Sequence, residues 1–414
     1  MPDKIAFILC VNNDLYFEEC SYYINCLAVP DGYEVEIIGI READSMCAAY
    51  NLGMQCTEAK YKVYMHQDVF IKEKEFIEHI ISIFQSDPET GMIGMVGGIG
   101  MPKTGVAYLA WNVGIADCRE PDMAYYLVCG PEKKKNMYVD AVDGLLMATQ
   151  YDVLWREDLF RNFDFYDISQ SFEMRRHGYK IIVPYQQTPW VIHDSSFAKL
   201  NHYDINRRIC LEEYPEYFTE DEGFAFSYQE EWEILSEELA SEVRKLICTG
   251  KWDEVKNIIQ AYRKHQMKNS MLEMYGIMSD IYQKEKQEHI DEGFFWGLSG
   301  WEEIYQKYIT VRFLLRRMEM GMSESEYMEL IVALKKGIVS CDAVIIMVLH
   351  SVLNKKTVLL KIEQCYRDAG AVENADKVRR FFEKIKDKSI PETLSKRAKK
   401  EKSEERVCYE RKFV

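Results

Sequence analysis

The sequence contains no apolar run long enough to cross a bilayer. Its first apolar run, Ile5–Val11, is short, and it lacks the basic leader and the small-residue cleavage site of a signal peptide. The twelve cysteines form neither a C-x-x-C pair nor a zinc-ligand pattern. Cys10, Cys47, Cys129 and Cys210 lie in apolar or mixed surroundings, which indicates reduced core thiols. These absences predict a soluble, cytoplasmic protein.

The sequence also lacks an excess of positive charge, since 68 acidic residues outnumber 52 Lys and Arg residues. The formal net charge is −16 and the isoelectric point about 5.2, which argues against a general nucleic-acid-binding protein. The exception is Lys377–Val414, where 14 basic and 7 acidic residues leave a local charge of +7 (14 minus 7). We expect the Lys/Arg-rich end of this tail, from Lys396 onward, to be a frayed helix or disordered. Peripheral contact with an acidic partner or an anionic membrane surface is the alternative.

The chain is long enough to form two domains. It has 414 residues, 47% of them hydrophobic, and its pattern changes near residue 220. Residues 1–220 alternate short apolar runs with helical patterns, which predicts an α/β domain with a mostly parallel sheet and helices on both faces. The expected strands are Lys4–Val11, Tyr33–Ile40, Tyr61–Met65, Met92–Val96, Tyr179–Pro184 and Val191–Asp194. The expected helices are Tyr16–Leu27, Ala43–Ala59, Phe76–Gln85 and Ser169–His177.

Residues 221–414 carry no strand signal and predict an all-α domain. The expected helices are Ser236–Cys248, Trp252–His265, Ser270–Lys284, Ser299–Met318 and Ser323–Lys336, the last two opened by capping boxes. Short turns at Gly250 and Gly370 resemble those of tetratricopeptide hairpins. Because the segment has no clean 34-residue period, we expect an irregular helical domain.

Four polar side chains stand at expected strand ends or helix starts. They are Asp68, Asp143, Asp167 and His193. Open α/β sheets bind ligands at the carboxyl ends of their strands, and a hard cation that bridges phosphates needs oxygen ligands. Each residue also has a purely structural interpretation. Asp68 or Asp143 would cap a turn, Asp167 would be a helix N-cap, and His193 would be a hydrogen-bonded core histidine.

Short motifs follow one another in a set order along these elements. They are Val11-Asn12-Asn13 after the first strand, Ser45 and Asn51 on the second helix, His66-Gln67-Asp68 at the end of the third strand, and then Asp167, Gly178, Pro184 and His193. With these motifs, the stretch from Lys4 to about Asn201 resembles the GT-A-fold glycosyltransferases of family 2. Within that family it is similar to the streptomycin-biosynthesis-type subset.

The resemblance implies an inverting transfer of a sugar from a nucleoside-diphosphate sugar to an acceptor hydroxyl. The acceptor would be a glycan, a lipid-linked precursor, a protein side chain or a small molecule. Asp167 would be the general base, and Asp68 and His193 would hold a divalent cation, Mn²⁺ or Mg²⁺. The donor would contact Val11, Asn12, Asn13, Glu42, Ser45, Asn51, Gln67, Asp143 and Gly144. The helical half would select the acceptor or a partner.

The chain departs from the family pattern where a D-x-D motif would place two acids, because His66 and Gln67 precede a single Asp68. Further along, Ser169 and Glu173 replace a second acid and an arginine, and Arg175 and Arg176 stand nearby. The departures leave a second hypothesis open, a catalytically weak or inactive scaffold whose helical half is an interaction module. A nucleotidyltransferase is a third class. It would need a glycine-rich basic loop after the first strand, which is absent here.

Overall fold

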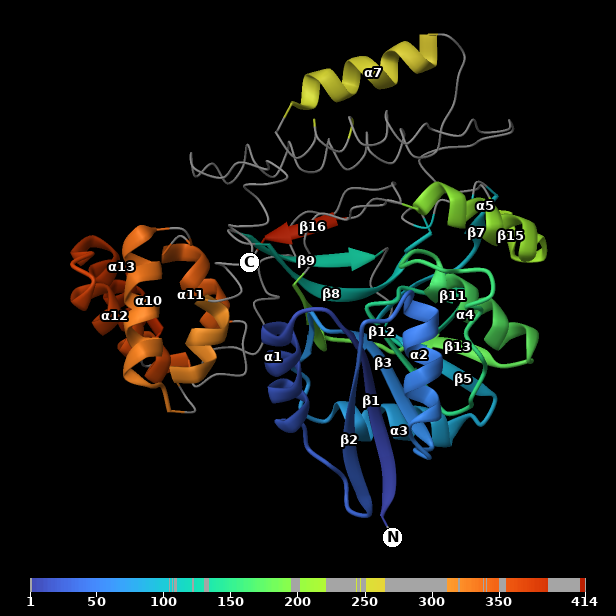
Figure 1. The fold of residues 1–414 in the computed structure, drawn as a ribbon, viewed down its shortest axis with the longest axis horizontal. Coiled ribbons are helices and arrows are strands. Elements are labelled where there is room, and N and C mark those ends of the chain that lie inside the picture. The colour runs from blue at the N-terminus through green and yellow to red at the C-terminus, as the bar shows by residue number, and fades with distance from the viewer. Residues whose placement is uncertain are drawn as a thin grey trace.

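The computed structural model describes residues 2–103, 105, 107, 110–120, 123–129, 134–194, 202–220, 243, 246, 251–264, 311–318, 321–337, 339, 341–349, 355–385 and 410–413. Sheets and helices alternate in the first half of the described chain, and helices dominate the second half (Figure 1). The expected fold class, an α/β domain followed by a helical region, is therefore confirmed. The position of the domain boundary near residue 220 stays a prediction.

The main sheet has seven strands in the order β10-β13-β5-β12-β3-β1-β2. Their bounds are β1 (Asp3–Val11), β2 (Tyr33–Arg41), β3 (Tyr61–His66), β5 (Thr90–Gly94), β10 (Met137–Val139), β12 (Leu146–Thr149) and β13 (Lys180–Val183). β1 runs parallel to both of its neighbours, with Phe7 opposite Ile37 and Val63. Residues 5–9 of β1 are fully buried, as expected for a strand covered on both faces.

The main sheet is mixed, whereas the sequence predicted a mostly parallel one. The pairs β1–β2, β1–β3 and β13–β5 are parallel, and the pairs β10–β13, β12–β3 and β12–β5 are antiparallel. The change of direction arises at β12, which follows the turn at Asp143-Gly144 and inserts between β3 and β5. An apolar run shows that a strand is buried but not which way it runs, so this reversal was not predictable.

Two helices cover opposite faces of this sheet. α1 (Asp14–Asn25) packs on Gly39 of β2, where an added Cβ would lie 2.8 Å from Phe17 Cε2. The next residue of β2, Ile40, faces α2 (Met46–Gln55) and lies 3.6 Å from a Cβ added at Gly53. Adjacent strand residues point to opposite faces, so α1 and α2 lie on opposite faces, as predicted. The other helices of this half are α3 (Phe76–Ser86), α4 (Tyr166–Arg176), α5 (Tyr203–Glu213) and the 3-10 helix η2 (Pro215–Tyr217).

A second sheet, which the sequence did not predict, has the order β11-β6-β8-β14-β4, with β9 paired to β8. Its strands are β4 (Val69–Ile71), β6 (Val96–Gly98), β8 (Val113–Glu120), β9 (Met123–Cys129), β11 (Ala141–Val142) and β14 (Val191–His193). Gly97 and Gly98 lie in β6. A Cβ at Gly98 would lie 2.4 Å from the carbonyl oxygen of Ala110, so this close approach of the two backbones requires glycine. A two-stranded pair joins β7 (Met101–Pro102) to β15 (Phe218–Glu220).

The two sheets meet at the turn between β3 and β4. β3 ends at His66, and after Gln67 and Asp68 the chain continues as β4 of the second sheet. β14 runs antiparallel to β4 and places His193 opposite Val69. This junction therefore brings the end of β14 beside the end of β3, which lie far apart in the sequence.

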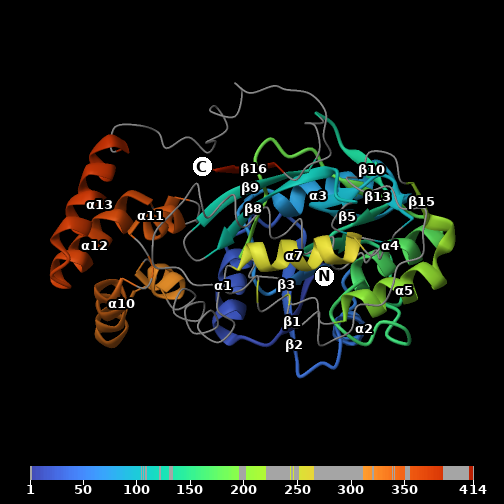
Figure 2. The same ribbon diagram turned by 90° about the horizontal axis from the view of Figure 1, so that it is seen from above.

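The second half contains α7 (Trp252–Lys264), a helical stretch at 311–318, α10 (Glu324–Lys336), α11 (Cys341–Leu349), α12 (Lys355–Asp368) and α13 (Val372–Ile385). The capping box predicted at Ser323 is present, since its hydroxyl accepts from the backbone N–H of Glu326 and the Glu326 side chain accepts from that of Ser323. α10 to α13 gather on the side of the α/β domain where α1 lies (Figures 1 and 2). The helix predicted at Ser270–Lys284, most of that at Ser236–Cys248 and the capping box at Ser299 lie outside the described residues.

The end of the chain differs from the frayed helix or disordered tail that the sequence predicted. Residues 386–409 lie outside the described residues, and Glu410–Phe413 form the strand β16, antiparallel to β9. β9 pairs with β8 along one edge, and the backbone groups of its other edge pair with β16. Among the helices that the structure describes, none is long and apolar enough to cross a membrane. The ten described cysteines are all free.

Candidate active site

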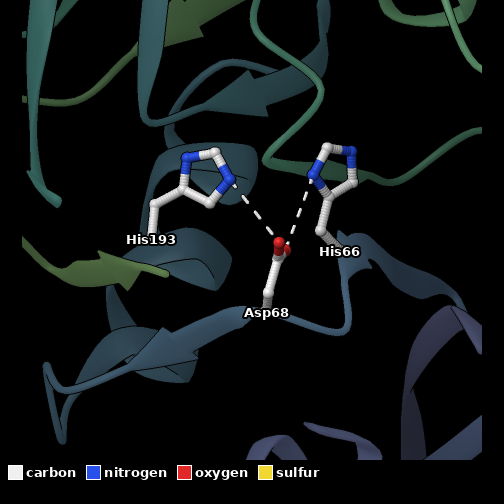
Figure 3. Close-up of side chains that lie close together, drawn as sticks. All are labelled: His66, Asp68 and His193. Carbon is white, nitrogen blue, oxygen red and sulfur yellow. Dashed lines mark ion pairs between the residues drawn. The ribbon is translucent and has the colours of Figure 1, made fainter. Parts of the chain in front are cut away.

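His66, Asp68 and His193 form a cluster at the junction of the two sheets. Figure 3 shows both imidazole rings turned toward the carboxylate of Asp68, from opposite sides. Asp68 Oδ1 lies 3.8 Å from His66 Nδ1 and 3.9 Å from His193 Nε2. The three ligand atoms lie within 4.8 Å of one another. This spacing fits three donors that converge on one ion.

The cluster is partly buried, and its side chains are between 21% and 27% exposed. Burial lowers the pKa of His66 to about 4 and also lowers the pKa of His193, so both imidazoles are neutral and can donate lone pairs. Burial raises the pKa of Asp68, against the opposing effect of His66. Asp68 Oδ1 is buried and has no hydrogen-bond partner among the described residues. A buried carboxylate oxygen without a partner is costly, and a bound cation would satisfy it.

The donor set therefore fits a divalent cation, although the sequence predicted only two of its three members. Asp68 and His193 were expected, and His66 was regarded as a departure from the D-x-D pattern. If Asp68 merely capped a turn, its carboxylate would accept a backbone N–H. Oδ1 accepts no hydrogen bond from the described residues. Two imidazoles and one carboxylate suit a first-row transition metal better than Mg²⁺, which prefers oxygen ligands.

Tyr166 links this cluster to the next acidic group. Its hydroxyl contacts His66 Nε2, so that Nδ1 of the same ring faces Asp68. Tyr166 packs on Gly144, where an added Cβ would lie 2.1 Å from the tyrosine hydroxyl. Gly144 was predicted to contact the donor, and its position shows why a side chain cannot be accommodated there. The Gly144 N–H donates to Asp167 Oδ2 over 2.9 Å.

Asp167 lies in the first turn of α4 and is not its N-cap. The N-cap is Phe165, which has a left-handed backbone (φ 64°) and makes no side-chain cap bond. Asp167 accepts hydrogen bonds from the backbone N–H groups of Gly144 and Ile168. Burial, with a further contribution from the charge of Asp143, raises the pKa of Asp167 to about 7. A carboxylate with this pKa is suited to take up a proton near neutral pH.

Asp143 lies between the cluster and Asp167. Its Oδ1 accepts from the backbone N–H of Leu145 over 3.0 Å, which is the turn geometry that the structural interpretation predicted. Burial raises the pKa of Asp143, and His193 opposes that shift. Since its charge acts on both Asp167 and His193, Asp143 couples the two parts of the site electrostatically.

The loop after β1 is held against the turn after β3. Gln67 Oε1 accepts from the backbone N–H groups of Asn12 and Asn13, each over 3.0 Å, and Gln67 Nε2 donates to the side chain of Asn12. Asn13 also caps α1, because its side chain accepts from the N–H groups of Leu15 and Tyr16. These bonds bring two of the predicted donor-binding segments together beside Asp68.

The other predicted donor contacts have structural partners of their own. Ser45 caps α2 by accepting from Ala48 N–H, which makes that helix shorter than predicted. Asn51 is buried, and its side chain exchanges two hydrogen bonds with the backbone of Trp155. Val11 is buried at the end of β1. Glu42 is exposed after β2 and has a left-handed backbone with φ 55°, which is uncommon for a residue with a side chain. Donor contact by these four residues stays a prediction.

The residues that replace the family's second acid and arginine form a separate network. Ser169 and Glu173 both hydrogen-bond the hydroxyl of Tyr214. Arg176 pairs with Glu173, with Glu213 of α5 and with Glu216 of η2. Arg175 pairs with Asp140. These ion pairs join the two arginines to acids outside the cluster, and their role as stand-ins for the missing arginine stays a prediction.

A family model described as a glycosyltransferase-like family matches residues 6–214, which is 209 of the 414 residues. The chain belongs to this family. It is therefore a glycosyltransferase, and the predicted enzyme class is confirmed. The streptomycin-biosynthesis-type subset stays a prediction. No curated protein matches the chain in sequence.

Solved structures give distant similarities to this glycosyltransferase. One is the mannosyltransferase PcManGT from Pyrobaculum calidifontis, in complex with GDP-Man and Mn²⁺. It has 11% identity and a TM-score of 0.34, over 69% of this chain and 89% of that one. Another is A197 from STIV, with 7% identity and a TM-score of 0.28, over 44% of this chain and 80% of that one. Because both scores are low, the assignment rests on the family match.

Two residues of the candidate site, His66 and Tyr166, were not predicted from the sequence. His66 stands at the end of β3, where the sequence comparison treats it as a departure from the D-x-D pattern. Tyr166 directly precedes Asp167, and a buried tyrosine hydroxyl needs a partner. Its partner is His66, 100 positions away, a separation that no local pattern reveals.

Proposed function

We propose that this glycosyltransferase transfers a sugar with inversion from a nucleoside-diphosphate sugar to an acceptor hydroxyl, with Asp167 as the general base. One observation carries the proposal. The cluster His66–Asp68–His193 and a carboxylate whose pKa is about 7 lie on one continuous set of contacts, through Tyr166 and Gly144. A site for a diphosphate and a site for a proton acceptor would thus adjoin each other.

In the proposed reaction, Asp167 takes the proton of the acceptor hydroxyl. The acceptor oxygen then forms a bond to the anomeric carbon as the bond from that carbon to the diphosphate breaks on the opposite face. The hydrogen bonds from Gly144 and Ile168 keep Asp167 in place through this step. Burial of Asp167 makes its ionised form a stronger base than an exposed aspartate.

His66, Asp68 and His193 would hold the divalent cation, and Mn²⁺ suits this donor set better than Mg²⁺. When bound, the cation supplies Lewis-acid stabilisation of the diphosphate leaving group. Gln67 fixes Asn12 and Asn13 beside the cluster, where they would contact the nucleotide. The hypothesis of a weak or inactive scaffold drew on the lone acid of the D-x-D position. The presence of His66 and His193 beside Asp68 weakens that reason.

A thermal-shift screen tests the donor class. We expect one nucleoside diphosphate to raise the melting temperature more with Mn²⁺ than without it, because a ligand that binds only the folded state stabilises it. At a concentration about 100 times the dissociation constant, the gain in unfolding free energy would be about 2.7 kcal/mol. The matching nucleoside monophosphate is the control. If no nucleoside diphosphate shifts the transition with either cation, the proposed donor class is wrong.

The contact between Tyr166 and His66 gives a second test. Tyr166→Phe removes only the hydroxyl that holds the His66 ring, and outer-shell partners of this kind affect metal affinity by about 10–100-fold. We therefore expect the Mn²⁺ affinity of Tyr166→Phe, measured by isothermal titration calorimetry, to be about 10–100-fold weaker than that of the parent. Tyr50→Phe is a matched control, since Tyr50 is a buried neighbour whose hydroxyl has no hydrogen-bond partner among the described residues. Equal Mn²⁺ affinity in the two variants would show that Tyr166 does not orient His66.

A further inference from the structure

Arg312, in the second half of the chain, contacts residues of the α/β domain next to the His66–Asp68–His193 cluster. It lies in the helical stretch 311–318, and its guanidinium contacts three elements of the first half. Nη2 lies 3.0 Å from Glu19 Oε1 of α1, and Nη1 pairs with Asp194 Oδ2 directly after β14. The guanidinium carbon also lies 4.6 Å above the ring of Phe70 in β4. One side chain therefore joins α1, β4 and β14.

These contacts are almost completely removed from solvent. The side chains of Arg312, Glu19 and Asp194 are 7%, 5% and 0% exposed. Burial raises the pKa of Glu19 and the nearby Asp194 adds to that rise, whereas the charge and hydrogen bond of Arg312 and the charge of Arg316 oppose it. Two buried carboxylates so close together repel each other unless a cation lies between them. Arg312 supplies that charge, and its planar fork matches two oxygen acceptors.

The same contacts lead directly to the site. Asp194 follows His193, and its backbone N–H donates to the carbonyl oxygen of Asp68 over 2.9 Å. Phe70 lies two residues after Asp68, and Tyr16 of α1 donates to Asp194 Oδ2. Arg312 thus acts on both strands that present the cluster.

We propose that Arg312 is a positioning residue for the metal and donor site, so that the helical half of the glycosyltransferase completes this site in addition to any part in acceptor selection. The proposal rests on the proposed function, because the site that Arg312 positions is the one assigned there to the cation. Arg312 fixes the direction of His193 through Asp194 and that of Asp68 through Phe70 and the Asp194–Asp68 backbone bond. It is the only residue of the described second half with ion pairs recorded to both Glu19 and Asp194.

Arg316 provides a matched control on the same helix. It lies one turn further along, on the same face as Arg312, and its side chain is also buried at 5% exposure. Its recorded ion-pair partner is Glu18, over 3.4 Å, and the Glu18 side chain is 59% exposed. Loss of Arg316 removes a buried arginine and an ion pair between the two halves but leaves Asp194 in place. A general effect of weaker docking between the halves would therefore appear in both variants.

The experiment compares Arg312→Met and Arg316→Met in the full-length chain. Mn²⁺ affinity is measured by isothermal titration calorimetry well below the melting temperature. Amide hydrogen exchange of residues 66–71 and 191–194 is measured without metal, with α2 as the reference segment. We expect Arg312→Met to weaken Mn²⁺ binding by about tenfold or more, the size of effect seen for outer-shell partners, and to speed exchange in the two segments but not in α2. Arg316→Met should keep both quantities close to the parent values.

The outcomes separate this proposal from the proposed function. If the parent binds Mn²⁺ and Arg312→Met binds it equally well with unchanged exchange, Arg312 is a structural ion pair only and the proposal is overturned. If the parent binds no Mn²⁺, the metal assignment fails, and selective exchange in the two segments decides alone whether Arg312 positions them. If Arg312→Met does not fold, Arg312→Lys takes its place, because it keeps a charge for the two acids but lacks the planar fork. The expected changes then have the same direction and a smaller size.

Discussion

Asp167→Asn is expected to retain donor binding and to lose sugar transfer by about 10²–10⁴-fold, the range for loss of a general base. Asparagine keeps the size of the side chain, but its one oxygen can accept from the N–H group of either Gly144 or Ile168, which bond separate oxygens of Asp167. It cannot take a proton from the acceptor. The measurement is the transfer rate with saturating donor, beside the dissociation constant of the nucleoside diphosphate. A rate within a few-fold of the parent would mean that Asp167 is not the base.

The pH dependence of transfer follows from the same residue. Because the pKa of Asp167 is about 7, its carboxylate takes up a proton as the pH falls through 7, and activity should fall with it. The folded-state pKa lies above the ordinary value, so the folded state favours the protonated form. The contribution of Asp167 to the free energy of unfolding is therefore fully present at low pH, below the ordinary pKa of an aspartate, and it is lost as the pH rises toward and through 7. For this reason Asp167→Asn should melt at an equal or higher temperature than the parent at pH 8, although it is less active.

Asp164→Asn is a suitable control for both measurements. Asp164 lies just before α4, three residues before Asp167, and burial raises its pKa as well. Its recorded contacts are with His202 and, through its carbonyl oxygen, with Asn206. A loss of transfer confined to Asp167→Asn would assign the effect to the position of that carboxylate rather than to a charge removed from the loop.

Local signals in the sequence predicted most of the elements that build the site. β1, β2, β3 and α1 lie within two residues of their predicted bounds, whereas α2 is shorter than predicted at both ends. These elements have continuous apolar runs or capping residues such as Ser45. In the second sheet, only β14 was predicted, as Val191–Asp194. β4, β6 and β11 have three residues or fewer, and β6 contains Gly97 and Gly98, so their sequences do not differ from those of a loop. β8 and β9, with eight and seven residues, were also missed.

The parts of the site that could not be predicted depend on contacts between distant residues. Asp68 and His193 were identified one at a time, but their approach requires the antiparallel pairing of β4 with β14. Arg312 approaches Asp194 only because its helix packs against the α/β domain. In the sequence, Arg312 looks like any arginine of an amphipathic helix. The sequence therefore predicted which single residues could bind a cation, but not the distant residues that contact them and fix their positions.

Asp68→Asn is expected to abolish Mn²⁺-dependent binding of the nucleoside diphosphate and to leave the fold intact. Both imidazoles of the cluster are neutral, so Asp68 is the one negative ligand among the three, and the amide removes that charge with little change in shape. Loss of an outer-shell partner already costs about 10–100-fold in metal affinity, so loss of the charged ligand should cost at least about 100-fold. Asn also relieves the buried carboxylate oxygen that has no hydrogen-bond partner in the described chain, so the melting temperature without metal should not fall.

The measurement is calorimetric titration of Mn²⁺ and then of the nucleoside diphosphate, into the parent, Asp68→Asn and a control. Asp14→Asn is a matched control because it removes the same charge from the start of α1, next to the Asn12-Asn13 loop, where its side chain is 82% exposed and pairs with Arg41. It should bind Mn²⁺ as the parent does. Mg²⁺ titrated in the same way should bind the parent more weakly than Mn²⁺, because two of the three ligands are nitrogen donors. If Asp68→Asn binds Mn²⁺ and the nucleotide as tightly as Asp14→Asn does, the cation lies elsewhere, and the junction of the two sheets is not its site.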